Sequence, residues 1–244
     1  MKHQYFGDVN DFRKYGLLRK LQLHSGLRLG VSWMLTADDG RNDGNFTSYL
    51  AQPGKWRPHD PELFDHLVTA ISTGRHLDRV REHNLLPGAT FVDALVPDGR
   101  RERYAFAAAA LTRLADADLI FFDPDNGLEI SSCAIGRKGS AKYLMWSEVA
   151  DAYAKGKSIL IYQHFRREER GAFISRIANE LRATTACHSV LCFRTAHVAF
   201  FLVIQPLHSA LLNAAAMHVE ASWAGQIECS QPSSLAMSEN KCPH

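Results

Sequence analysis

Three acidic residues follow a short apolar run near the middle of the chain, and their spacing could hold a cation or accept hydrogen bonds. The segment reads Leu119-Ile-Phe-Phe122 and then Asp123-Pro-Asp125-Asn-Gly-Leu-Glu129. Clustered carboxylates repel one another unless a metal ion, a bound proton or a donor-rich ligand offsets their charge. This segment is therefore a candidate functional site.

The apolar run predicts a strand that is buried on both faces, as in a parallel sheet covered by helices. Pro124 and Gly127 do not favour a continued strand, so the acids lie just beyond its carboxyl end. Open α/β sheets bind their ligands at this edge. Position and charge therefore point to the same segment.

A second polar group follows the next predicted strand, over residues 158–162. His164 and Arg166 come directly after it. Neighbouring parallel strands end at the same edge of a sheet, so we expect His164 beside the acidic segment. A histidine there could act as a base or a metal ligand, or serve only in capping and packing.

The elements predicted around these residues alternate between strand and helix. Strands are predicted over 29–35, 89–96, 119–122, 158–162, 188–193 and 198–206. Helices are predicted over 9–24, 60–86 with a break near 72–74, 100–115, 142–155, 168–183 and 208–223. This order predicts an α/β fold with a doubly wound, mostly parallel sheet and a C-terminal antiparallel hairpin. We expect one domain over residues 1–224 and a disordered polar tail over residues 225–244.

The composition is that of an ordinary globular protein, with 244 residues, 46% apolar content and a net charge of +2. Three basic clusters stand out within this near-neutral chain. They could form a composite phosphate-binding surface, or simply three solvated faces. The first comprises Arg13, Lys14, Arg19 and Lys20. The two arginine clusters, Arg100, Arg101 and Arg103, and Arg166, Arg167 and Arg170, are the expected contacts to RNA or DNA.

The five cysteines contain no CxxC pair and no zinc-like spacing, which predicts free thiols in a reducing compartment. No apolar run reaches the roughly 18 residues that a membrane span needs. The first residues lack the long apolar core of a signal peptide. We therefore expect a cytoplasmic protein.

Several short motifs resemble S-adenosylmethionine-dependent methyltransferases that act on exocyclic amines of nucleic-acid bases. Asp123-Pro124 is similar to the Asp-Pro-Pro-aromatic loop of these enzymes. The segment Gly7-Asp8-Val-Asn-Asp11-Phe-Arg-Lys14-Tyr15-Gly-Leu17 resembles the opening of the ribosomal-RNA large-subunit adenine methyltransferases and, more weakly, that of the three-Cys-motif partner proteins. Phe201-Leu-Val-Ile-Gln-Pro206 is similar to the late strand of the first family, which ends in Asn-Pro-Pro.

The resemblance implies a Rossmann-like fold, S-adenosylmethionine as cofactor and methylation of a base amine. Asp123 would accept hydrogen bonds from the target amine, so that geometry carries most of the catalysis. Lys14, Asp38 and Gly40 would contact the cofactor. Asp38 and Gly40 belong to Thr36-Ala-Asp-Asp-Gly-Arg41, which stands where the family has its glycine-rich cofactor loop.

The sequence departs from the family at two points. Asp125 replaces the second proline and no aromatic follows it, and Asp38-Asp39-Gly40 replaces Gly-x-Gly. Two alternatives therefore stay open. One is a Mg²⁺-dependent nuclease or phosphoesterase that uses Asp123, Asp125, Glu129 and His164. The other is a non-catalytic nucleic-acid-binding relative of the methyltransferase fold.

Overall fold

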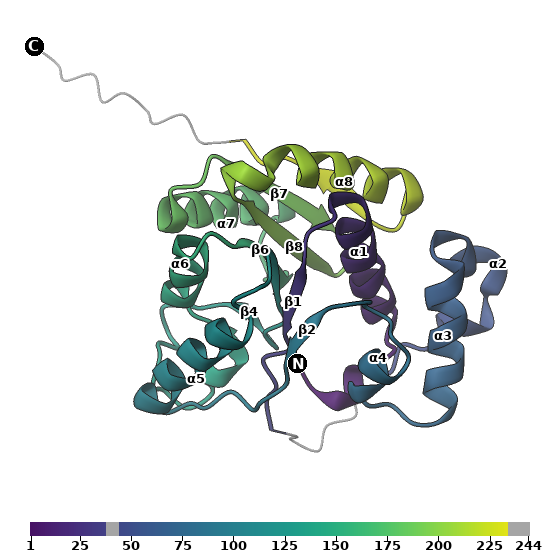
Figure 1. The fold of residues 1–244 in the computed structure, drawn as a ribbon, viewed down its shortest axis with the longest axis horizontal. Coiled ribbons are helices and arrows are strands. Elements are labelled where there is room, and N and C mark those ends of the chain that lie inside the picture. The colour runs from purple at the N-terminus through teal and green to yellow at the C-terminus, as the bar shows by residue number, and fades with distance from the viewer. Residues whose placement is uncertain (38–43, 234–244) are drawn as a thin grey trace, which may run out of the picture.

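A seven-stranded sheet runs through the middle of the protein between two layers of helices (Figure 1). The structure, a computed structural model, describes residues 1–37 and 44–233. In spatial order the strands are β2 (Thr90–Val92), β1 (Leu29–Ser32), β3 (Leu119–Phe122), β6 (Ser158–His164), β8 (Val198–Ile204), β7 (Ser189–Arg194) and β9 (Glu228–Ser230).

The four strands β2, β1, β3 and β6 are parallel, and β8, β7 and β9 continue the sheet in antiparallel pairs. The predicted α/β fold with an antiparallel hairpin after a parallel core is thus confirmed. β1 lies between β2 and β3, so the chain builds first to one side of β1 and then to the other. Ligands of open α/β sheets bind at such a reversal of strand order.

Alternate side chains of β3 enter two separate cores, which explains its unbroken apolar run. Leu119 and Phe121 face the layer that contains α1 (Val9–Ser25), α3 (Pro61–Ser72), α4 (Asp78–Glu82) and α8 (Ser209–Ser222). Ile120 and Phe122 face the layer of α5 (Arg100–Arg113), α6 (Trp146–Ala154) and α7 (Arg170–Thr185). Both faces of the strand therefore exclude water, as a buried parallel strand requires.

Helix α1 confirms the helix predicted over residues 9–24. Its N-cap is Asp8, whose side chain accepts a hydrogen bond from the backbone N–H of Asn10 at 2.8 Å. The helix ends at Gly26, which adopts the left-handed φ of 68° that favours glycine at this position. Its inner face packs along α8.

Short elements complete the fold, and most of them lie in segments for which no element was predicted. They are α2 (Pro53–Trp56), the two-residue strands β4 (Gly127–Leu128) and β5 (Tyr143–Leu144), and 3-10 turns at His3–Tyr5, Ser48–Ala51, Arg57–His59, Ser140–Lys142 and Pro206–His208. Because β5 pairs with β4, the helix predicted from residue 142 begins only at Trp146. Strand β6 runs on to His164, so this histidine ends the strand rather than following it.

The prediction of a disordered tail from residue 225 is wrong for the residues that the structure describes. β9 pairs with β7, and Ile227 just before it is buried. A strand edge offers unpaired N–H and C=O groups, which a short polar segment can satisfy without an apolar pattern of its own. Residues 234–244 lie outside the described part of the chain.

The cysteines and the helix lengths bear on two expectations from composition. Cys133, Cys187, Cys192 and Cys229 are free thiols, as predicted. None of the helices in residues 1–37 and 44–233 combines the length and apolar character that a membrane span requires.

The contact between α1 and α8 predicts a strong effect of Gly16→Ala. A Cβ atom at Gly16 would lie 1.8 Å from Cζ2 of the buried Trp223 ring. Overpacking of this kind costs about 1–3 kcal/mol, so we expect that loss in the free energy of unfolding, measured by urea denaturation. Gly54→Ala is the matched control, because a Cβ there meets nothing within 4 Å. Equal stabilities of the two variants would contradict the packing.

Candidate functional site

A cavity of about 270 Å³ opens at the carboxyl ends of β3 and β6, beneath the first turns of α1. It lies on the side of the sheet where strand order reverses between β1 and β3. Its walls include the predicted site residues Lys14, Asp123, Asp125 and His164. The fold therefore brings together residues that are far apart in the sequence.

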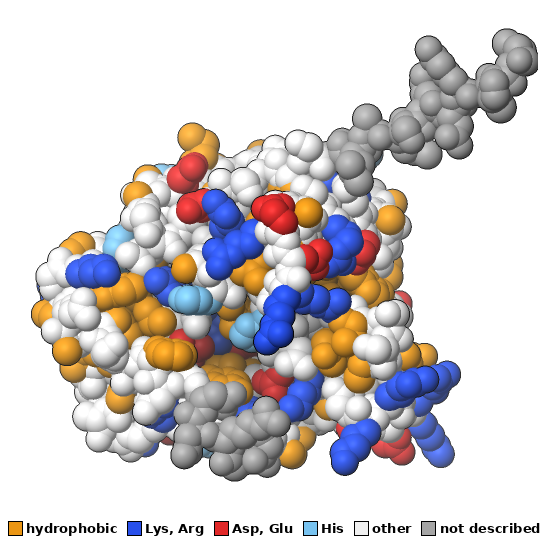
Figure 2. All heavy atoms as spheres, turned by 180° about the vertical axis from the view of Figure 1, so that it is seen from behind, with side chains coloured by type: hydrophobic (Ala, Val, Ile, Leu, Met, Phe, Trp, Pro, Cys, Tyr) orange, Lys and Arg blue, Asp and Glu red, His pale blue; other side chains and the backbone are white. Residues whose placement is uncertain are grey.

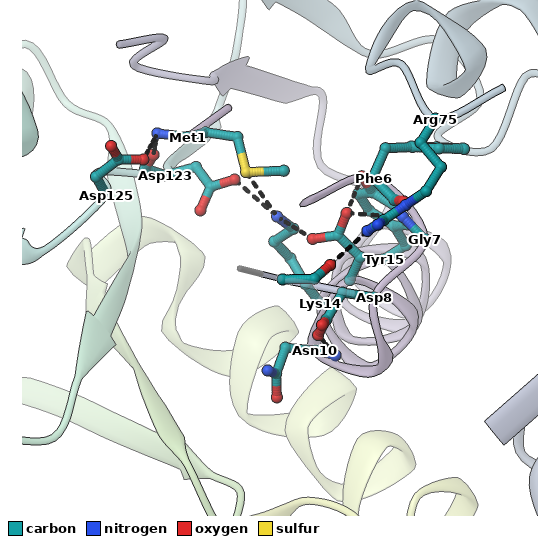
Figure 3. Close-up of polar contacts among 12 residues, drawn as sticks. Met1, Phe6, Gly7, Asp8, Asn10, Lys14, Tyr15, Arg75, Asp123 and Asp125 are labelled. Carbon is teal, nitrogen blue, oxygen red and sulfur yellow. Dashed lines mark hydrogen bonds and ion pairs between the residues drawn. The ribbon is translucent and has the colours of Figure 1, made fainter. Parts of the chain in front are cut away.

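Lys14 lies at the centre of the site, between two buried carboxylates (Figure 3). Its Nζ is 2.7 Å from Oδ1 of Asp11 on the same helix and 2.7 Å from Oδ2 of Asp123 after β3. All three residues are at most 4% exposed. The cation thus joins α1 to the central strand, and it offsets the charge that the sequence leaves unexplained at Asp123.

Aromatic rings surround the ammonium group of Lys14. The ring centroids of Tyr15, Trp33 and Tyr162 lie 5.3, 5.5 and 5.8 Å from its Nζ. A desolvated cation gains from such contacts with ring faces. The hydroxyl of Tyr15 also donates a hydrogen bond to Asp11 at 3.0 Å. The charged group is therefore enclosed by both carboxylates and rings.

Burial and charge act in opposite directions on the pKa values of this group. Burial raises the pKa of Asp11 from 3.8 to about 6, although the neighbouring Lys14 opposes the shift. Burial alone would lower the pKa of Lys14, but Asp11 and Asp123 outweigh it and hold that pKa above its ordinary value. Lys14 is therefore charged throughout the physiological pH range.

Asp125 makes a second buried ion pair, with the α-amino group of Met1 at 2.6 Å. The same amino group donates to the carbonyl oxygens of Met34 at 3.1 Å and Asp123 at 3.2 Å. Thr36 donates its hydroxyl to the other oxygen of Asp125 at 2.5 Å. Burial tends to raise the pKa of Asp125, but the ammonium of Met1 and the hydroxyl of Thr36 hold it below its ordinary value.

His164 stands at the rim of the cavity, at the end of β6. Its side chain is exposed, yet the cavity walls desolvate the ring and lower its pKa from 6.5, against the pull of Asp123 and Asp125. The ring also meets Tyr162 edge to face, with 5.0 Å between centroids. The histidine is thus mainly neutral at pH 7 and borders both acids.

Glu129 does not join the other acids of its segment. Its Oε2 accepts a hydrogen bond from the backbone N–H of Trp146 at 3.2 Å, at the start of α6. It lies outside the cavity that holds Asp123, Asp125 and His164. Within residues 1–37 and 44–233, no three His, Cys, Asp or Glu side chains converge as a metal site would require.

The two arginine clusters differ in their surroundings. Arg103 is 1% exposed, and its guanidinium contacts Glu148 at 2.5 and 2.7 Å and the carbonyl of Tyr143 at 2.8 Å. The prediction of Arg103 as a phosphate contact is therefore wrong, because the side chain is consumed inside the helical layer. The other five arginines, Arg100, Arg101, Arg166, Arg167 and Arg170, are exposed. On the face seen in Figure 2, basic side chains are interspersed with acidic ones rather than gathered in one field.

The predicted cofactor contacts Asp38 and Gly40 lie outside the described residues. The segment that follows them is held by Arg75, which donates to the carbonyl of Phe6 at 2.8 Å and to Asn45 at 2.9 Å. Gly44 packs directly on Tyr5, where a Cβ would lie 2.1 Å from the ring, and it has a left-handed φ of 77°. These contacts fix one wall of the cavity.

Sequence reasoning missed Asp11, Met1 and Arg75. Asp11 had a usable signal, since it stands three residues before Lys14 on a predicted helix and so on the same face. Met1 and Arg75 had none, because their roles depend on contacts with segments remote in the sequence.

Comparison with known proteins places no family name on this chain. No family model and no curated protein matches it. Among solved structures, a Legionella pneumophila protein of the DUF519 family aligns at 12% sequence identity and a TM-score of 0.46, over 94% of this chain and 97% of that one.

The raised pKa of Asp11 predicts a pH-dependent difference between the protein and its Asp11→Asn variant. A carboxyl whose pKa is raised on folding stabilises the folded state below pH 4, and this contribution is lost as the pH rises through about 6. The asparagine variant lacks that loss. We expect the variant to gain about 3 kcal/mol relative to the parent between pH 4 and pH 7.5, measured by urea unfolding at each pH. Parallel pH profiles would contradict this assignment.

Replacement of Lys14 by an uncharged residue should lower the free energy of unfolding, and by more than Asp11→Asn raises it relative to the parent. Lys14→Met leaves Asp11 and Asp123 buried without their counter-charge, which costs about 3–5 kcal/mol of unfolding free energy at pH 8. The loss should shrink at pH 5, because the pKa of Asp11 is raised to about 6 and this carboxylate takes up a proton there. Lys20→Met, on the more exposed side of the same helix, is the control and should change stability by less than about 0.5 kcal/mol. A small, pH-independent loss in Lys14→Met would refute the buried triad.

Proposed function

We propose that this protein is an S-adenosylmethionine-dependent methyltransferase that acts on an exocyclic amine of a nucleic-acid base. The observation that carries the proposal is the placement of Asp123. It is a buried carboxylate directly after the central parallel strand, at the reversal of strand order, with one oxygen fixed by Lys14. In the amine methylases that Asp123-Pro124 resembles, this carboxylate accepts a hydrogen bond from the target amine.

Lys14 gives Asp123 the properties that this role needs. A cation 2.7 Å away offsets the charge of the carboxylate and fixes its rotamer. An ionised carboxylate has about four acceptor positions, so the bond to Lys14 leaves others for an amine. The amine is then oriented by a rigid acceptor, and positioning rather than strong basicity accelerates the reaction.

The cavity also suits the methionine end of the cofactor, which carries an α-ammonium group and a sulfur. The ammonium of Met1 lies here against Asp125 and two carbonyls (Figure 3), so an α-ammonium group fits this part of the cavity. Asp125, which replaces the second proline of the related loops, would serve as counter-charge to the cofactor's ammonium once Met1 withdraws. The bound cofactor would supply an electrophilic methyl group.

The acceptor side of the cavity has aromatic groups for a base. The loop after Asp125 lacks the aromatic of the related enzymes, but Phe46 lines the same cavity from another segment and is 67% exposed. An extruded base is usually held by stacking on such a side chain. The exposed Arg166, Arg167 and Arg170 follow His164 at the rim and are available for phosphates.

The Mg²⁺-dependent alternative has no comparable support. Asp123 and Asp125 are each paired with a cation of the chain, and Glu129 is engaged at α6. The cofactor titration and the methyl-transfer assay described next distinguish the non-catalytic alternative from the proposal.

Calorimetric titration with S-adenosylmethionine tests the cofactor, and transfer of labelled methyl groups to short RNA and DNA strands tests the reaction. We expect Asp123→Asn to bind the cofactor within a few fold of the parent and to lose transfer by about 100-fold or more, because the amide is a weaker acceptor for the amine. Asp93→Asn, an exposed aspartate after β2, is the matched control and should be fully active.

The absence of any cofactor binding at millimolar concentration would overturn the proposal. Cofactor binding without transfer to any strand tested would leave the binding-module alternative in its place. Transfer that survives Asp123→Asn would remove Asp123 from the reaction.

A further inference from the structure

A second cavity lies on the opposite side of the sheet, between α5 and α6. Its volume is about 380 Å³, and its floor is formed by Ser32 and Phe122 at the carboxyl ends of β1 and β3. It is separate from the Asp123 site, which α1 covers from the other layer. Cavities of about 300–1,000 Å³ are the size at which proteins bind small molecules.

Ser32 supplies a buried polar atom that has no use within the fold. The residue is 1% exposed, and its hydroxyl has no hydrogen-bond partner among the described residues. Its backbone is satisfied, since its carbonyl accepts from the N–H of Asp123 at 3.0 Å. Strand alternation places the side chain on the α5 side, because Val31 faces the α1 layer. A native structure retains an unpaired buried hydroxyl for a reason, and a ligand is one such reason.

The walls of this cavity are suited to a flat ring. Phe106, Phe122 and Tyr104 line it together with Leu111 and Leu144, and Tyr104 at the rim is 54% exposed. Aromatic rings pack on other rings by offset stacking and edge contacts. The lining is thus mainly apolar, with the hydroxyl of Ser32 at its base, and it also includes Thr112, whose hydroxyl donates to the carbonyl of Ala108, and Ser147.

The charged groups that line the cavity do not require a charged ligand. Glu148 lines it, but both its oxygens accept hydrogen bonds from Arg103, and one also accepts from the N–H of Met145. Asp151 on α6 and Lys155, the C-cap of that helix, lie at the exposed mouth with opposite charges. An uncharged ligand therefore fits best.

Met34 connects the two cavities. It is a non-glycine residue with a left-handed φ of 47°, a conformation that costs on the order of 1 kcal/mol or more. Its carbonyl accepts the ammonium of Met1 in the Asp123 site, while its residue lines the second cavity. A ligand in the second cavity thus contacts a residue that shapes the first.

We infer that the second cavity binds an uncharged, flat heteroaromatic small molecule, which hydrogen-bonds to the hydroxyl of Ser32. This inference does not depend on the proposed methyl transfer.

The test uses two probes of the same shape on the full-length protein. Benzimidazole carries ring nitrogens that can bond to Ser32, and indene is its hydrocarbon counterpart. Binding is measured from chemical-shift changes in ¹H–¹⁵N spectra, which also show where the probe lies. We expect shifts to centre on α5, α6 and the end of β1, with benzimidazole binding more tightly than indene.

Three variants separate the contributions. Ser32→Ala should weaken benzimidazole binding about tenfold and leave indene binding unchanged, without lowering the melting temperature, because no partner of the hydroxyl is lost. Ala107→Phe, which fills the cavity from α5, should abolish binding of both probes. Ala109→Phe, exposed on the same helix and outside the lining, should abolish neither.

The inference is overturned if neither probe shifts these resonances at millimolar concentration, or if Ala107→Phe leaves binding intact. Equal losses for the two probes in Ser32→Ala would remove the hydroxyl from recognition. A marked fall in melting temperature in that variant would instead make Ser32 a structural residue.

Discussion

The fold around the candidate site depends on one buried cation. Lys14 is held between Asp11 and Asp123 within a shell of aromatic rings, and charges so deeply buried are stable only when each is paired. The pairing ties the first long helix to the central strand and fixes where the chain turns after Phe122. The cavity beside Asp123 follows from that constraint, since the helix closes over the strand ends at a distance set by the lysine side chain.

The local parts of this arrangement could be predicted from the sequence. The strand 119–122 was predicted to the residue, because an apolar run bounded by Asp118 and by Asp123-Pro124 has sharp physical limits. The N-cap of α1 was also predictable, because Asp8 is a preferred capping residue and directly precedes the helical pattern. The ion pair between Lys14 and Asp123 was not, because the two residues are 109 positions apart and helical spacing cannot tell which basic residue meets which acid.

The prediction for Arg103 failed for a different reason. The sequence contains a helical pattern that places Arg103 on a buried face, but the neighbouring arginines suggested an exposed one. Arg103 belongs to an arginine-rich segment that resembles a solvated face, but Ala110 and Leu114 follow it at helical spacing and are buried like it. The buried face of α5 could therefore have been predicted from the sequence. The partner was not, since Glu148 lies on a helix 45 positions away. The strand β9 was not predicted for a third reason: it is specified by the free edge of β7 rather than by its own residues.

Asp123 and Asp125 have distinct physical roles in the structure. Asp123 is paired with a side chain that belongs to the wall of the cavity, whereas Asp125 is paired with Met1, a residue at the end of the chain. A ligand with its own ammonium group would compete with Met1 for Asp125 and for the carbonyl of Met34. The apparent affinity of such a ligand is its intrinsic affinity multiplied by the fraction of molecules in which Met1 has withdrawn. Under the proposed function, the replacement of proline by Asp125 therefore both creates the ammonium site and makes Met1 a competitor for it.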